Sequence, residues 1–136
     1  MTASEVVPGV FVGGWNDAIV FRGAKVCVRS EAPEGMTRVT HVPVYDEERE
    51  EPIRANLDRV ADLIASARKY HPPVLVFCGH GVRRSPLAVA WYLHRSEGIS
   101  LDEAFARIAA VRPRVEHVRE WAGRWTVLDD PASKKR

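Results

Sequence analysis

The chain has 136 residues, of which 46% are hydrophobic and 28% are charged, and its formal net charge is +2. These proportions are those of ordinary globular proteins, and they exclude a disordered, collagen-like or membrane-spanning chain. A chain of this length supports one hydrophobic core, so we expect a single domain over residues 1–130 and a short basic tail at 131–136. Because the N-terminus has no basic segment followed by an apolar one, we expect a cytoplasmic protein. We also expect a monomer without a membrane or nucleic-acid partner.

The chain contains only two cysteines, Cys27 and Cys78. Two cysteines cannot make a disulfide framework, and no pair of Cys or His residues has the spacing of a zinc site, so we expect no metal and no cofactor. Cys27 lies in a predicted strand and is most simply a small core residue. If that strand neighbours the one that ends at Cys78, a protective disulfide between the two is a further hypothesis.

Strands dominate the first half of the chain. Pro8 and Gly9 separate two short β-like segments, which predicts a strand pair at the start. Two later segments alternate and are rich in β-branched residues, and a continuous apolar run beyond them predicts a buried central strand. The predicted strands are residues 5–7, 10–12, 25–29, 38–44 and 74–78.

Helical patterns alternate with strands from the middle of the chain onward. The first helix begins at Pro52, and the second follows Pro86 and ends near Gly98. The third opens with a capping box at 100–103, and the fourth covers 115–128. The pattern predicts an α/β fold, a three-layer sandwich in which a central, mostly parallel sheet of about five strands is flanked by helices.

A polar loop joins the predicted central strand to the helix after Pro86. Ligands of open α/β sheets bind at the carboxyl ends of the strands, so a site is expected in this loop. Gly79 and Gly81 allow the backbone amides to curl around an anion, and Arg84 can close over it with two parallel hydrogen bonds. The candidate phosphate-binding residues are Gly79, His80, Gly81, Val82, Arg83 and Arg84, with the side chains of His80 and Arg83 expected to face solvent.

Cys78 begins this loop and is the candidate nucleophile. Helix amides and arginine stabilise a thiolate, which can attack phosphorus, and Ser85 can donate a hydrogen bond to the sulfur and help it to leave. A buried structural thiol at a strand end is the alternative. The sequence around Cys78 favours the catalytic interpretation, because a predicted strand precedes the loop, a predicted helix follows it, and Gly81 and the Arg84-Ser85 pair lie within it.

The segment Cys78-Gly-His-Gly81-Val-Arg-Arg84-Ser85 is similar to the Cys-x-x-Gly-x-x-Arg-Ser/Thr signature of the protein tyrosine phosphatase superfamily, and the layout resembles its small dual-specificity branch. Residues 8–14 and 111–115 resemble the opening hairpin and the Arg-Pro segment of these enzymes. The resemblance implies a transiently phosphorylated cysteine, an arginine that holds the phosphoryl oxygens, and an aspartate on a separate loop. It also implies a phosphorylated protein or peptide substrate, with phosphotyrosine first and phosphoserine or phosphothreonine as further candidates.

The general acid is expected in the acidic segment 46–51. This segment follows the strand predicted at 38–44, whose carboxyl end should lie near that of strand 74–78. A carboxylate must protonate the leaving oxygen and later take a proton from water. Asp46 resembles the dual-specificity general acid in position and is the candidate; Glu47 and Glu48 are the reserve candidates, and a merely solvated acidic loop is the alternative.

Three positions depart from the family pattern. Phe77 stands where the family usually carries histidine, Arg83 where it often has glycine or serine, and His117 where Pro-Asn often follows the Arg-Pro segment. These departures leave open a catalytically weak phosphate-binding scaffold. Relatives of this fold also act on phosphoinositides and on phosphorylated RNA ends, so a phosphatase for a non-protein phosphate ester is a further alternative. Arg83, Arg112 and Arg114 would attract such polyanions, whereas the acidic segment would repel them.

Other thiol-dependent families are the remaining alternatives. The low-molecular-weight tyrosine phosphatases share Cys-x5-Arg-Ser-Pro, but there the signature opens the chain. A rhodanese or an arsenate reductase would explain the thiol and would give Asp46 and the Arg-Pro segment no role.

Overall fold

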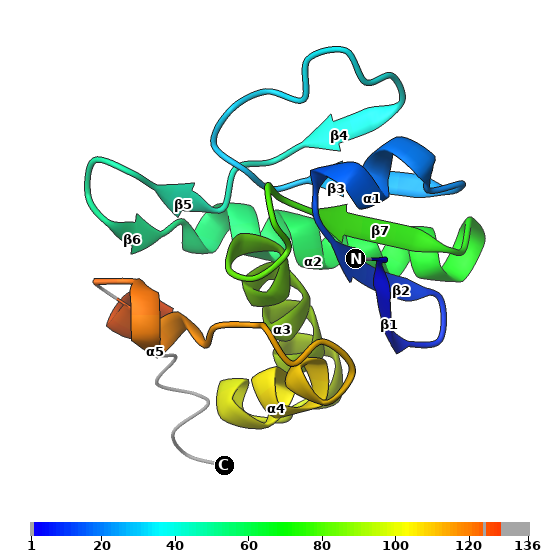
Figure 1. The fold of residues 1–136 in the computed structure, drawn as a ribbon. Coiled ribbons are helices and arrows are strands. Elements are labelled where there is room, and N and C mark those ends of the chain that lie inside the picture. Colours follow the sequence, from blue (N-terminus) through cyan, green and yellow to red (C-terminus); the bar gives the residue numbers. More distant parts are fainter. Residues whose placement is uncertain (1, 124, 129–136) are drawn as a thin grey trace.

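The computed structural model describes residues 2–123 and 125–128, and its centre is a five-stranded sheet (Figure 1). The strands of this sheet are β1 (Ser4–Val7), β2 (Val10–Gly13), β3 (Ala24–Cys27), β4 (Val39–His41) and β7 (Val74–Phe77). Their order is β1-β2-β7-β3-β4, and every neighbouring pair except β1 and β2 is parallel. The predicted mostly parallel sheet and its central strand are therefore confirmed.

The two faces of the sheet bury different sets of side chains because successive residues of a strand point to opposite sides. In β7, Val74 and Val76 join the large core cluster, whereas Leu75 and Phe77 belong to a smaller cluster on the other face. All four are completely buried. The continuous apolar run is thus explained by a strand that is covered on both faces.

Helices cover both faces, as expected for a three-layer α/β fold (Figure 1). The helices are α1 (Trp15–Val20), α2 (Arg54–Tyr70), α3 (Arg84–Glu97), α4 (Leu101–Val111) and α5 (Val118–Trp121), followed by a 3₁₀ turn at Trp125–Leu128. Apolar residues of α2, α3 and α4 belong to the large cluster, and Ala18 of α1 belongs to the small one. Gly98 ends α3 in the left-handed conformation, with φ +70°, as predicted for a helix-terminating glycine.

The structure corrects four details of the predicted elements. The helix expected from Pro52 begins at Arg54, because Pro52 lies in β6 (Glu51–Pro52), which pairs with β5 (Tyr45–Asp46) in a small second sheet. The strand expected over 38–44 is shorter, and α1 was not predicted. The helix expected over 115–128 is broken, because the chain leaves α5 in an extended conformation at Ala122.

Among the described residues, no helix is long and apolar enough to cross a membrane. The basic tail predicted at 131–136 lies outside the described residues, as does the end of the predicted domain at 130.

Candidate active site

The candidate site lies at the carboxyl end of β7, which β2 and β3 flank in the sheet. The chain leaves β7 after Phe77 and enters α3 at Arg84, so residues 78–83 form a tight connection at the centre of the sheet edge (Figure 1). We call residues 78–84 the phosphate loop, after its predicted role. The helix begins earlier than the sequence indicated, which places Arg84 and Ser85 in its first turn.

The carbonyl groups of the phosphate loop point outward and are held there. The Gly79 carbonyl accepts from the backbone of Trp15 at 2.9 Å, and the Val82 carbonyl accepts from the backbone of Glu116 at 2.8 Å. The loop carbonyls therefore lie away from the centre of the loop, which leaves its inner side to N–H groups. A concavity of backbone N–H groups at a helix N-terminus favours an anion.

Arg112 holds two further carbonyls of the loop from behind. Its Nε donates to the Gly81 carbonyl at 2.8 Å, and its Nη2 donates to the His80 carbonyl at 3.4 Å. The side chain is only 2% exposed and also lies 3.6 Å from the carboxylate of Asp17. The expectation that Arg112 attracts external polyanions is wrong, because this residue is buried beneath the loop.

Two glycines permit the close approach of the loop to the end of β2. Gly81 has φ +72°, and a Cβ there would lie 2.6 Å from the carbonyl carbon of Gly13. A Cβ on Gly14 would lie 2.8 Å from the carbonyl oxygen of Gly79. Any side chain at either position would push the loop away from the hairpin that supports it.

Cys78 points into the loop and is 3% exposed. Its Sγ receives the backbone N–H of Gly81 at 3.3 Å and lies 3.3 Å from Oγ of Ser85. The Ser85 hydroxyl is completely buried and also lies 3.1 Å from the carbonyl of Gly13. Its single proton can point to that carbonyl when the sulfur carries its own proton or a phosphoryl group, and to the sulfur when it is a thiolate. The structure thus brings together the predicted nucleophile and the predicted hydroxyl donor.

The Arg84 guanidinium lies over the same region and pairs with the carboxylate of Glu47. Its Nε is buried and has no hydrogen-bond partner among the described residues, and its side chain is 27% exposed. Glu47 also accepts from the hydroxyl of Ser30 at 2.9 Å. A carboxylate therefore engages the guanidinium that was expected to hold phosphoryl oxygens.

Asp46, the predicted acid, accepts hydrogen bonds from the backbone of the turn that follows it. Its Oδ1 accepts from the backbone of Glu48 at 3.0 Å and from that of Arg49 at 3.1 Å. The neighbouring Glu47, a reserve candidate, is the carboxylate that contacts the phosphate loop. The acidic segment therefore contacts the phosphate loop through Glu47.

The side chains of His80 and Arg83 do not turn into the loop. Both residues are exposed, and Arg83 donates from Nε to Glu116 at 3.1 Å. The expectation that both side chains face solvent is confirmed.

The departures at Phe77 and His117 have different consequences. Phe77 is buried on the α1 face against Trp15, with ring centroids 6.1 Å apart, and offers no hydrogen bond. His117 caps α5, because its Nδ1 accepts from the backbone of Arg119 at 3.1 Å. A histidine thus performs the helix capping for which asparagine is a common choice.

Cys27 lies beside Phe77 in the register of β3 and β7, so it faces away from Cys78. It packs in the smaller cluster, whereas Cys78 belongs to the large one, and both thiols are free. Burial raises the pKa of Cys27, with only partial compensation by the nearby Arg29. The disulfide hypothesis is not supported, because the two side chains lie on opposite faces of the sheet.

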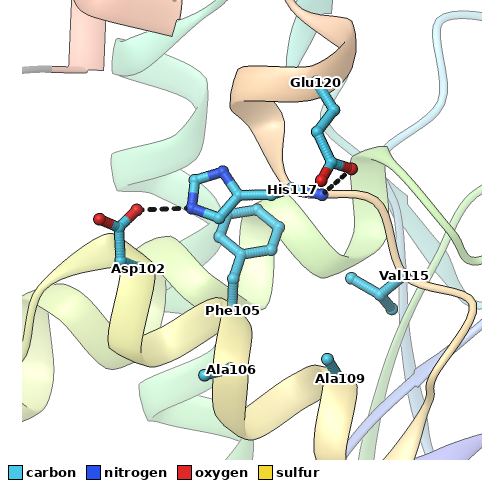
Figure 2. A pocket seen from close by; sticks show the side chains of 7 residues that line it. All are labelled: Asp102, Phe105, Ala106, Ala109, Val115, His117 and Glu120. Atoms are coloured by element: carbon cyan, nitrogen blue, oxygen red, sulfur yellow. Dashed lines mark hydrogen bonds and ion pairs between the residues drawn. The ribbon is translucent and has the colours of Figure 1, made fainter.

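A separate depression of about 280 Å³ lies between α4 and the segment before α5 (Figure 2). His117 stacks on Phe105 there, with ring centroids 4.3 Å apart, and its Nε2 lies 2.8 Å from Asp102. No group of His, Cys, Asp and Glu that could hold a metal ion occurs in the part of the chain that the structure describes. The lining is Asp102, Phe105, Ala106, Ala109, Val115, His117 and Glu120.

Most of the chain matches the model of a known protein family. The model of the dual specificity phosphatase catalytic domain matches residues 22–124. The chain belongs to this family. Dual specificity phosphatase 28 of Mus musculus is 28% identical to this phosphatase over 123 residues, which is 83% of this chain and 75% of the relative. Dual specificity protein phosphatase 14 of Mus musculus is 39% identical over 83 residues, or 61% of this chain and 40% of the relative.

Solved structures agree on the fold of this phosphatase. The crystal structure of DUSP15 superposes with a TM-score of 0.77 over 98% of this chain and 91% of that one, at 20% sequence identity. The family match sets aside the low-molecular-weight phosphatase, rhodanese and arsenate reductase alternatives. The chain is a hydrolase of the dual-specificity protein phosphatase family, which implies phosphoprotein substrates.

Proposed function

We propose that this phosphatase hydrolyses phosphomonoesters of proteins through a cysteinyl-phosphate formed on Cys78. The observation that carries the proposal is the position of Cys78 Sγ at the start of α3, within a loop whose carbonyls from Gly79 to Val82 accept hydrogen bonds from groups outside the loop. A phosphate dianion bound by the loop amides would place phosphorus in line with the sulfur. Phosphotyrosine is the first substrate, and phosphoserine and phosphothreonine are further substrates.

In the first step, Cys78 attacks phosphorus as the thiolate. The S–P bond forms while the P–O bond to the leaving group breaks, and Asp46 gives its proton to the departing oxygen. Arg84 and the loop amides bind the equatorial oxygens, where charge spreads in phosphoryl transfer. Preorganised donors of this kind contribute about 3–4 kcal/mol each in comparable sites.

In the second step, water attacks the phosphorus of the cysteinyl-phosphate. Asp46 takes a proton from that water, the O–P bond forms and the S–P bond breaks, which releases inorganic phosphate. The Ser85 hydroxyl, 3.3 Å from Sγ, turns its proton to the thiolate as it leaves. No metal and no cofactor enters either step.

The contact between Glu47 and Arg84 must open before Arg84 can bind a phosphoryl group with both of its outer nitrogens. A phosphate dianion carries more charge than the carboxylate of Glu47 and can bind a guanidinium with two parallel hydrogen bonds. We propose that substrate replaces Glu47 at Arg84, and that the rearranged segment brings Asp46 over the leaving group. Glu47 itself is the alternative acid, because it already lies at the site.

A phosphate-binding scaffold is the second candidate function. The favouring observation is Phe77, which gives neither the loop nor Cys78 the hydrogen bond that the histidine usual in the family supplies. Such a protein would bind phosphate without turnover.

Three further expectations stay predictions: a cytoplasmic location, a monomeric state, and a non-protein phosphate ester as an alternative substrate.

The test is hydrolysis of p-nitrophenyl phosphate from pH 4 to 8 in the presence of EDTA. We expect the wild type to turn over, Cys78→Ser to be inactive, and Asp46→Asn to be slow and to lose one limb of the pH profile. If Asp46→Asn keeps the full profile and Glu47→Gln loses a limb, Glu47 is the acid. Phosphate or vanadate binding without turnover in the wild type would instead support the scaffold.

A further inference from the structure

Tyr45 is a buried aromatic residue directly before the predicted acid. It is 8% exposed and lies in β5, where it pairs with Pro52 of β6. Its ring contacts two groups from distant parts of the chain. The centroid of the ring lies 5.4 Å from the guanidinium carbon of Arg84 and 5.1 Å from the centroid of the Trp121 ring.

The contact with Arg84 uses the face of the tyrosine ring, since the guanidinium carbon lies over that ring. A cation over an aromatic ring is attracted by the negative face of the ring. In this arrangement Nη2 of Arg84 still pairs with the carboxylate of Glu47, so the ring contact leaves a guanidinium N–H group able to bind an oxyanion. The ring contact is therefore compatible with a bound anion, whereas the contact with Glu47 competes with it.

Little else fixes the orientation of Arg84 once an anion replaces Glu47. Its Nε is buried without a hydrogen-bond partner among the described residues, and its long side chain has many rotamers. The Tyr45 ring supplies a flat surface that restricts these rotamers before substrate arrives. Pre-organisation of this kind lowers the entropic cost of binding.

The ring is itself held by the C-terminal part of the domain. Trp121 of α5 packs on it at an angle of 53°, and α5 lies beside the β5–β6 hairpin (Figure 1). Gly123 follows closely, since a Cβ there would lie 3.4 Å from the backbone oxygen of Glu50 in the same hairpin. Burial raises the pKa of Tyr45, so the ring stays neutral at physiological pH.

We infer that Tyr45 is a positioning residue, held by Trp121, that seats the Arg84 guanidinium for the phosphoryl group. The inference rests on the proposed function, because it assumes that Arg84 binds the oxyanion. It gives α5 a part in catalysis without contact with substrate. It also places the support of Arg84 next to Asp46 in the chain, so that one residue couples the acidic segment to the phosphate loop.

The experiment compares orthovanadate binding by Tyr45→Leu, Tyr45→Phe and wild type, with thermal melting of each protein. We expect Tyr45→Leu to bind orthovanadate about tenfold more weakly and Tyr45→Phe to bind within about twofold of wild type, because phenylalanine keeps the ring face. Trp121→Leu should weaken binding in the same direction. Tyr92→Leu is the matched control, since Tyr92 is 5% exposed in α3 and its hydroxyl accepts from Arg68 rather than from a group at the site.

A merely structural role predicts another pattern. Tyr92→Leu and Tyr45→Leu would then both lower the melting temperature, and neither would change the affinity for orthovanadate. Unchanged affinity in Tyr45→Leu, or an equal loss in Tyr45→Phe and Tyr45→Leu, would overturn the inference while the proposed function stands. A wild type that neither binds orthovanadate nor hydrolyses p-nitrophenyl phosphate would overturn both.

Discussion

Arg112 donates from Nε to the carbonyl oxygen of Gly81 at 2.8 Å. Gly81 precedes α3 and Arg112 follows α4, so two helices separate the two residues in the chain. The same side chain reaches the carbonyls of Thr2 and His80, so one buried cation ties the N-terminus to the phosphate loop. The shape of the anion site thus depends on a residue that the bound phosphate would not touch.

Replacing Arg112 should therefore damage both stability and anion binding. Arg112→Met removes the cationic partner of the buried Asp17 carboxylate, which keeps the hydrogen bond from the backbone of Gly14, and we expect the free energy of unfolding to fall by about 3–5 kcal/mol. Urea unfolding and orthovanadate titration below the unfolding transition measure the two effects. Arg114→Met is the control, because Arg114 is exposed. Equal orthovanadate affinity in the two variants would contradict this role.

Glu47 competes with substrate for Arg84, so removing its charge should improve binding. For Glu47→Gln we expect a KM for p-nitrophenyl phosphate about two- to fivefold lower, in keeping with the small energies of partly exposed ion pairs. Glu48→Gln is the matched control, because Glu48 is an exposed carboxylate of the same segment. Steady-state kinetics at low ionic strength measure the difference, and a higher KM in Glu47→Gln alone would show that Glu47 helps substrate to bind.

Ser85 should act in the breakdown of the intermediate rather than in its formation. Ser85→Ala removes the hydroxyl 3.3 Å from Sγ, and a lost hydrogen bond to a charged group slows the release of the thiolate by about tenfold or more. We expect a burst of p-nitrophenol followed by slow turnover, with about 1 kcal/mol of stability lost with the hydroxyl. Stopped-flow absorbance follows the burst. Linear product formation at a reduced rate would instead place the effect in the first step.

The two cysteines should differ in reactivity. Burial raises the pKa of Cys27 above its ordinary value of 9.0, so its thiol stays protonated at neutral pH and forms a thiolate only under more alkaline conditions. Iodoacetamide at pH 7 should label Cys78 and leave Cys27 intact, and native Cys78→Ser should stay unlabelled. Peptide mass spectrometry reads both results. A Cys27–Cys78 disulfide after mild peroxide would contradict the opposite orientation of the two side chains.

Much of the site follows from one contiguous stretch of sequence. A buried strand, two glycines, an Arg-Ser pair and a helix are enough to predict that Cys78, Arg84 and Ser85 lie around one loop, because a strand–loop–helix unit has few conformations. The same local patterns predict β7 as the central strand and Gly98 as the end of α3. The acidic segment was also expected at this edge of the sheet.

Contacts between distant segments could not be predicted in this way. Arg112 is buried because α4 ends against the N-terminus and the phosphate loop. The Arg-Pro segment marks this residue in the sequence, but it does not show that Arg112 is buried while Arg114 is exposed. Glu47 rather than Asp46 meets Arg84 because the turn after β5 is held by Asp46 itself. The short helix α1 and the β5–β6 pair have too few residues for a periodic signal, and packing stabilises them.

The sequence by itself was enough to indicate the family, to predict the main strands and helices in their order along the chain, and to single out the residues of the phosphate loop. These features depend on spacing within one or two adjoining elements. Only the tertiary structure decided which carboxylate reaches Arg84, that Cys27 faces away from Cys78, that Arg112 is buried beneath the loop, and that the Tyr45 ring contacts Arg84. The physical reason is that side chains from remote segments meet through packing and burial, which depend on the whole chain at once.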